Sequence, residues 1–165
     1  MTDKGDFDKN GNLTPYELVE YSLTEIELYF VDSFPNSITR KSIYDGLVNY
    51  ILDISVYFSN SWSIWIDGSF ITTKLNPEDV DIVNVFEWNE RLNSNKGIFE
   101  DNFWADKSKK IYKVDANFMA VYSKKDSRYI DTIEMTKYWY GWFGKSRQPH
   151  EYPKGFIELK IANPI

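Results

Sequence analysis

Hydrophobic residues recur at helical spacing in two early parts of the chain. A Ser-Leu-Thr-Glu sequence at residues 22–25 is a capping box, so a helix is expected over residues 23–31. Between residues 43 and 58, apolar side chains repeat every three or four positions, which predicts a helix with one continuous apolar face. That face consists of Ile43, Leu47, Ile51, Ile54 and Phe58. We expect it to pack against a sheet.

Shorter runs of β-branched and aromatic residues predict the strands of that sheet. The strands are expected over residues 63–67, 80–86, 111–122 and 156–161. A short helix in the spacer 68–78 would end at Pro77, whose ring clashes with a continued helix. A further helix is expected over 131–143, and the 88–110 segment is interpreted as a helix or an irregular excursion. This order favours a two-layer α+β fold, in which a mixed β-sheet is backed by helices.

Residues 65–87 carry the clearest candidate chemistry. Gly68 has no Cβ, so its backbone can approach a ligand closely, and Ser69 adds a hydroxyl and a backbone N–H where a helix could begin. Asp79 and Asp81 lie two residues apart, so both carboxylates point to one face of a strand. Adjacent carboxylates repel unless a divalent cation lies between them, and Mg²⁺ commonly binds carboxylates together with substrate phosphates. The stretch therefore predicts a metal–triphosphate site.

A Gly-Ser pair after one strand and an Asp-x-Asp sequence opening the next resemble the signature of the nucleotidyltransferase superfamily. That superfamily includes polymerase-β-like enzymes and the minimal nucleotidyltransferases of bacterial toxin–antitoxin pairs. Its third carboxylate usually comes from a later strand, and Asp115 in the 111–122 strand is the candidate here. Taken alone, Asp115 would be interpreted as a solvated surface residue. The resemblance implies a mixed sheet of the nucleotidyltransferase type.

The chain is also similar, over nearly its whole length, to an uncharacterised family of small bacterial and phage-borne nucleotidyltransferase-like proteins. The matching phrases are Phe-Asp-Lys-Asn-Gly-Asn-Leu at residues 7–13, Asp-Gly-Ser-Phe-Ile-Thr-Thr-Lys at 67–74, Pro-Glu-Asp-Val-Asp at 77–81, Arg147, and Lys-Gly-Phe-Ile-Glu-Leu at 154–159. The chain departs from the family pattern at Thr14, where a proline is usual, and at Phe156, where an isoleucine is usual. Neither departure affects the expected metal site.

The resemblance implies a role for each candidate residue. Asp79 and Asp81 would hold Mg²⁺ (or Mn²⁺) against the triphosphate, and Asp115 would complete a second metal position or accept a proton from the attacking hydroxyl. Gly68 and Ser69 would contact the phosphates. Three basic residues are candidate phosphate clamps, namely Lys74, Arg147 and Lys154.

The motif and the resemblance lead to two hypotheses about function, which belong to different classes. The first is an active nucleotidyltransferase, which moves a nucleoside monophosphate from a nucleoside triphosphate such as ATP to a protein, RNA or small-molecule acceptor. The second is a catalytically silent protein of the same fold that acts as an antitoxin-like or phage regulatory binding partner. The chain is short for an enzyme of this superfamily, so a homo-oligomer or a protein partner could complete the cleft.

Residues 1–14 are polar and are expected to form an arm before a single nucleotidyltransferase-like domain over 15–165. Residues 6–17 match, position by position, the twelve-residue calcium loop of an EF-hand. The matching residues are Asp6, Asp8, Asn10, Gly11, Asn12 and Glu17. A fortuitous polar turn is the favoured interpretation, because only five residues precede Asp6 and Pro15 interrupts the loop.

Composition argues against several kinds of function and site. The formal net charge of −6 disfavours broad binding to long nucleic acids, which requires a basic face. The chain contains no cysteine, which excludes disulfides and thiolate metal sites. Neither a signal sequence nor an apolar run long enough to span a membrane is present in the sequence, so a cytoplasmic location is expected.

Overall fold

A computed structural model describes residues 4–147 and 150–162, and its centre is a mixed five-stranded sheet in the order β1-β5-β2-β3-β4. The strands are β1 (Leu18–Glu20), β2 (Trp62–Asp67), β3 (Val80–Glu87), β4 (Val114–Val121) and β5 (Phe156–Ile161). β1 runs parallel to β5 and β4 runs parallel to β3, while β2 is antiparallel to both of its neighbours. The protein therefore has the predicted α+β fold.

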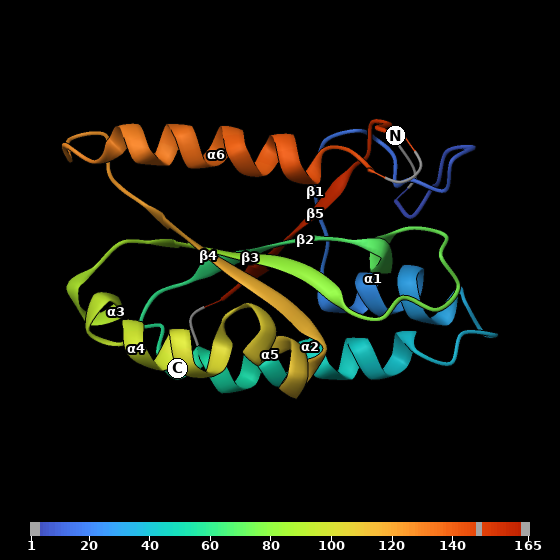
Figure 1. The fold of residues 1–165 in the computed structure, drawn as a ribbon, viewed down its shortest axis with the longest axis horizontal. Coiled ribbons are helices and arrows are strands. Elements are labelled where there is room, and N and C mark those ends of the chain that lie inside the picture. Colours follow the sequence, from blue (N-terminus) through green and yellow to red (C-terminus); the bar gives the residue numbers. More distant parts are fainter. Residues whose placement is uncertain (1–3, 148–149, 163–165) are drawn as a thin grey trace.

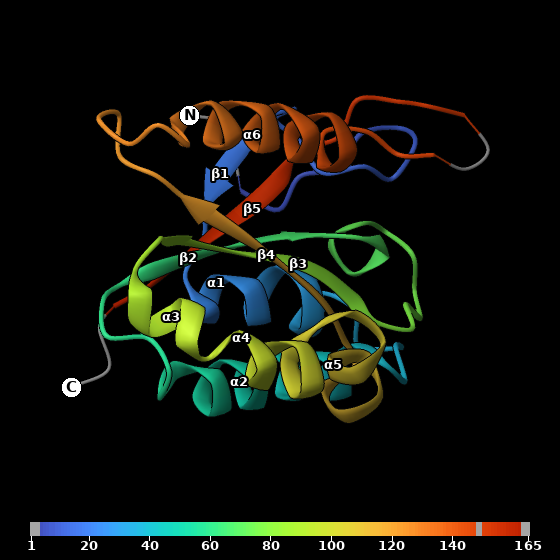
Figure 2. The ribbon, with the colours of Figure 1, turned by 60° about the vertical axis from the view of Figure 1, so that its left-hand side comes forward.

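Helices cover both faces of this sheet, but unequally. They are α1 (Leu23–Glu27), its π-helical continuation η1 (Leu28–Asp32), α2 (Arg40–Ser55), the 3₁₀ turn η2 (Ser69–Ile71), α3 (Glu90–Ser94), α4 (Lys96–Ile98), the π-helix η3 (Phe99–Phe103), α5 (Ala105–Tyr112) and α6 (Tyr129–Phe143). Figure 1 shows α1 to α5 below the sheet, and α6 is the only described helix above it. The turned view in Figure 2 shows the same separation. None of the described helices is long and apolar enough to cross a membrane.

The core forms between α2 and the sheet, as the helical periodicity predicts. All five residues of the predicted apolar face are buried. Opposite them, Ile64, Ile66 and Ile82 are completely buried on the strands. On the other face, α6 packs through a narrow stripe of Thr132, Trp139 and Phe143 and leaves much of its apolar surface exposed.

Element boundaries were predicted well where the signal is local. The capping box is present, since the Ser22 hydroxyl accepts from the Glu25 N–H and the Glu25 carboxylate accepts from the Ser22 N–H. The predicted start of the 111–122 strand is wrong, because α5 runs to Tyr112 and ends at Lys113 in the left-handed conformation (φ 60°). The expected stop at Pro77 is also wrong, because the 3₁₀ turn has already ended at Ile71.

The described part of the N-terminal segment packs against the rest of the protein. Leu13 and Asn12 are buried. The carbonyl of Gly11 accepts from the Thr73 N–H, and that of Leu13 accepts from the Gly155 N–H. This segment therefore joins two distant parts of the chain, and the division at residue 15 stays a prediction.

Arg40, at the start of α2, is the largest completely buried side chain. Its guanidinium donates to four backbone carbonyls, those of Phe30, Phe70, Thr72 and Lys74, at 2.5–2.8 Å. The same guanidinium lies over the ring of Phe34, with its central carbon 3.8 Å from the ring centroid. One side chain thus fixes the 70–74 loop to α2 and η1.

Replacing this anchor should destabilise the fold strongly. Arg40→Met leaves four carbonyls without their donor, and each buried unsatisfied group costs about 1–3 kcal/mol, so we expect the free energy of unfolding to fall by at least about 3 kcal/mol. Arg40→Lys keeps the charge but lacks the planar fork, and should recover only part of the loss. Urea denaturation measures both variants. Wild-type stability in Arg40→Met would contradict this assignment.

Candidate functional site

Three aspartates from adjacent strands lie side by side on the α6 face of the sheet. Asp67 pairs in register with Asp81 across β2 and β3, and Asp81 pairs in register with Asp115 across β3 and β4. Directly paired residues point to the same face of a sheet. Asp79 lies just before β3, two residues from Asp81. Strand register therefore brings the three predicted acids together and adds Asp67 to them. These four aspartates are called the acid row.

Burial and mutual repulsion make this row electrostatically costly. Burial, and then the charges of Asp79, Asp67 and Asp115, raise the pKa of Asp81 to about 7. Burial raises the pKa of Asp67 to about 6, although Lys154 opposes the shift. The pKa of Asp115 is also raised, again chiefly by burial. Removing these carboxylates from water disfavours their charged forms, and a nearby cation favours those forms.

Two lysines supply part of that positive charge. Lys154 lies 2.6 Å from Asp67, and both side chains are almost fully buried, at 6% and 7% exposure. The contact is an ion pair without good hydrogen-bond geometry, because Asp67 Oδ1 has no hydrogen-bond partner. Lys109, from α5, lies 2.5 Å from Asp79 and is 44% exposed. The predicted phosphate clamp Lys154 therefore directs its charge to the acid row.

The turn after β2 requires a glycine. Gly68 has φ 85° and ψ −173°, a conformation that is essentially restricted to glycine. A Cβ at this position would also collide with Oδ2 of Asp81. The backbone at Gly68 therefore packs directly against the Asp81 side chain of the acid row. The expected helix start at Ser69 is a single three-residue 3₁₀ turn, so Ser69 contributes its hydroxyl and N–H rather than a helix dipole.

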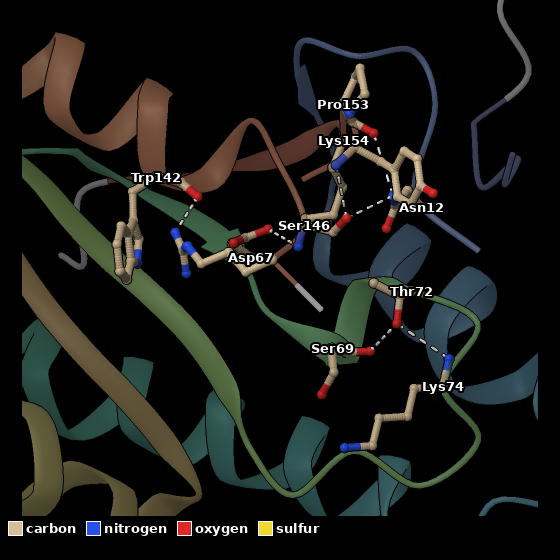
Figure 3. A network of polar contacts seen from close by, with 11 residues as sticks. Asn12, Asp67, Ser69, Thr72, Lys74, Trp142, Ser146, Pro153 and Lys154 are labelled. Carbon is tan, nitrogen blue, oxygen red and sulfur yellow. Dashed lines mark hydrogen bonds and ion pairs between the residues drawn. The ribbon is translucent and has the colours of Figure 1, made fainter. Parts of the chain in front are cut away.

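A cleft of about 540 Å³ opens beside the acid row (Figure 3). Asp67 and Asp81 form its acidic side, and the five predicted nucleotide-binding residues Gly68, Ser69, Lys74, Arg147 and Lys154 all line it. Lys145 adds a further positive charge. Asp79 and Asp115 continue the row outside this lining, near Lys109. The volume lies within the range of small-molecule pockets.

The walls of the cleft come from three segments that are distant in sequence and joined by hydrogen bonds. The Asn12 side chain donates to the Ser146 hydroxyl at 3.3 Å and to the Pro153 carbonyl at 3.4 Å (Figure 3). The Thr72 hydroxyl donates to the Ser69 carbonyl and accepts from the Lys74 N–H. The N-terminal segment, the 69–74 loop and the segment after α6 are thereby held in place.

The sequence profile of a family of unknown function, DUF6932, matches residues 5–160. The chain belongs to that family. No curated protein and no solved structure matches the chain. The DUF6932 match spans the acid row and every segment that lines the cleft, including the N-terminal one. The predicted nucleotidyltransferase resemblance stays a prediction.

The acid row contains carboxylates, the kind of ligand that binds divalent cations. Among residues 4–147 and 150–162, no three acidic or histidine side chains lie together in an arrangement that could hold a metal ion. Across the same residues, neither Asp81 nor Asp115 forms an ion pair with a basic side chain. Carboxylate oxygens are the ligands that Mg²⁺ prefers, so these two acids, with Asp79, fit such an ion.

The calcium loop suggested by residues 6–17 is not an EF-hand. The Asp8 carboxylate accepts from the backbone N–H groups of Asn10 and Asn12, and from the Tyr16 hydroxyl. Asn12 is buried and points to Ser146 and Pro153. A strand, β1, follows the loop where an EF-hand has a helix. These polar residues build a turn and a wall of the cleft.

Sequence reasoning missed two residues of the site, for different reasons. Asp67 stands directly before Gly68, and pairing the two strands as an antiparallel hairpin would have placed it opposite Asp81. Lys109 carried no usable signal, because its helix α5 lies in a segment without clear periodicity and reaches Asp79 only through the tertiary fold.

Lys154→Met should cost more stability than Asp67→Asn. Removing one partner of a buried ion pair typically costs about 3–5 kcal/mol. Lys154→Met leaves the Asp67 carboxylate beside Asp81 without its counter-charge, whereas in Asp67→Asn the lysine still faces Asp81. Urea denaturation of both single variants and of the double variant measures the difference. Equal losses in the two single variants would refute this ordering.

Gly68→Ala should distort the site. The unfavourable backbone conformation costs about 1–3 kcal/mol, and the added methyl group displaces the Asp81 carboxylate. We expect a folded protein with a lower melting temperature. Gly97→Ala is the control, because a Cβ there meets no atom within 4 Å. Thermal unfolding followed by circular dichroism compares the two variants, and the same melting temperature in both would contradict the argument.

Proposed function

We propose that this protein is a Mg²⁺-dependent nucleotidyltransferase, which transfers a nucleoside monophosphate from a nucleoside triphosphate to a hydroxyl of a protein, an RNA or a small molecule. The observation that supports this most directly is the position of the acid row. Asp67 and Asp81 of the row border the glycine turn at residues 68–69 and line a cleft that also contains Lys74, Lys145 and Arg147, and Asp79 and Asp115 continue the row beside it. A cleft lined by both acidic and basic side chains suits a metal–triphosphate complex.

Each residue has a distinct task in this proposal. Asp79, Asp81 and Asp115 would hold the cation, which when bound neutralises charge on the triphosphate. The backbone N–H groups and hydroxyl at Gly68 and Ser69 would donate to phosphate oxygens. The basic residues of the lining would attract the remaining phosphate charge.

The reaction needs an attacking oxygen and a proton acceptor. The acceptor hydroxyl forms a bond to the α-phosphorus, the bond from that phosphorus to the bridging oxygen breaks, and pyrophosphate leaves. Asp115 would either complete the metal site or accept the hydroxyl proton. The cytoplasm, where nucleoside triphosphates are available, is the expected location.

A catalytically silent binding protein, antitoxin-like or phage regulatory, is the second candidate. Two of the four acids in the row are already paired with lysines, so the fold neutralises much of its own charge. Exposed apolar residues on α6, among them Ile130, Ile133 and Tyr138, offer a surface for a protein partner or a second copy of the chain. Triphosphate binding separates this candidate from the first.

The double variant Asp79→Asn with Asp81→Asn should keep its fold and lose Mg²⁺-dependent triphosphate binding. Removing two charges takes away cation ligands and also relieves repulsion within the row, so stability should not fall. Calorimetric titration of each of the four nucleoside triphosphates, with Mg²⁺ and again with EDTA, measures the loss. Circular dichroism checks the fold.

A matched control replaces two exposed acids far from the row, Asp45→Asn with Asp101→Asn, and has the same change in net charge. This control should bind like the wild type. Unchanged binding in the Asp79 and Asp81 variant would refute the site. If the wild-type protein binds no triphosphate, the silent binding protein becomes the better hypothesis.

A further inference from the structure

Trp142 is the exposed aromatic side chain of the cleft. It belongs to the last turn of α6 and is 45% exposed, whereas Phe143, the other aromatic residue of the lining, is buried. Figure 3 shows that the indole ring extends from α6 at the edge of the polar network. A flat ligand bound in this cleft would therefore contact Trp142 or the side chain that covers its ring.

Arg147 covers the indole. The central carbon of its guanidinium lies 3.0 Å from the ring centroid, and Nη2 donates to the carbonyl of Trp142 at 2.6 Å. This cation–π contact and the hydrogen bond together hold a mobile side chain in one orientation. On the preceding turn, Tyr138 is nearly parallel to the indole, with an interplanar angle of 5°. We call Trp142 and Arg147 the stacking platform.

The platform lies at a suitable place for the base of a nucleotide. The acid row and the Gly68 turn define the phosphate end of the cleft, so the base must lie beyond them along the lining. Trp142 and Arg147 line the same cleft as Asp67 and Gly68, which places the platform beside the phosphate end. Guanidinium planes and aromatic rings are the surfaces on which nucleobases stack.

We propose that the Trp142–Arg147 platform binds the nucleobase of the donor and gives the protein a preference for purine over pyrimidine nucleoside triphosphates. This inference rests on the proposed function and adds to it the class of donor. The preference follows from contact area, because a purine covers more of a flat surface than a pyrimidine does. It also changes the expected role of Arg147, which becomes a base-stacking residue instead of a phosphate clamp.

The test compares ligands with and without a base. The wild-type protein, Trp142→Ala, Trp142→Phe and Arg147→Lys are titrated calorimetrically with ATP, GTP, CTP, UTP and inorganic triphosphate in the presence of Mg²⁺. Trp142→Ala should weaken ATP and GTP binding by about 2- to 30-fold, the range for loss of the one cation–π contact that holds the Arg147 plane in place. Its affinity for inorganic triphosphate should stay within about two-fold of the wild type, since that ligand makes no stack.

Two conservative variants test the stacking geometry. Trp142→Phe keeps a ring and should retain most of the purine affinity, while Arg147→Lys keeps the charge, loses the plane and should lose part of it. Trp104→Ala is the matched control, because Trp104 is a half-exposed tryptophan that does not line the cleft, and it should bind every ligand like the wild type. Circular dichroism confirms that each variant is folded.

The outcomes separate this inference from the proposed function. If the wild type binds triphosphates and Trp142→Ala binds ATP as tightly, or loses inorganic triphosphate equally, the platform is refuted while the proposed function stands. Equal wild-type affinity for purines and pyrimidines also refutes the purine preference. If the wild type binds neither nucleotides nor inorganic triphosphate, both proposals fail.

Discussion

Repulsion between carboxylates on neighbouring strands is the constraint on which the rest of this structure depends. Register places Asp67, Asp81 and Asp115 side by side, and burial prevents water from screening them fully. Two lysine side chains supply compensating positive charge: Lys154 comes from the segment before β5, and Lys109 comes from α5. Such a row lowers the stability of the sheet, because apolar residues at those positions would carry no desolvation penalty.

The cleft beside the row exists because distant segments are tied together. Arg40 holds the 70–74 loop from below through three backbone carbonyls, and Asn12 joins the N-terminal segment to the chain around residues 146–153. The walls therefore move only if α2, the N-terminal segment or β5 moves with them. This bracing lets the glycine turn keep a conformation that would be unfavourable on a free loop.

Local patterns predicted the parts of the structure that local forces determine. The capping box at Ser22, the apolar face of α2 and the strands around Asp67 and Asp81 each depend on residues a few positions apart. The sequence also identified three of the four aspartates of the row. It could not indicate Arg40 or Lys109, because three of the four Arg40 partners and the Lys109 partner lie thirty or more residues away along the chain, and such contacts depend on how elements pack. The start of β4 was missed for a similar reason, since Lys113 ends α5 where β-rich residues suggested a strand.

The two lysines differ in a way that matters for any cation in the row. Lys154 is buried with Asp67, so exchanging its charge for another would require opening the core. Lys109 is 44% exposed, but the Asp79 side chain that it contacts is only 15% exposed, so this pair lies at the edge of the core. The Lys154 pair neutralises the fully buried end of the row, and the Lys109 pair neutralises its more accessible end. In the proposed function, a cation held by Asp79 would compete with Lys109 at that accessible end.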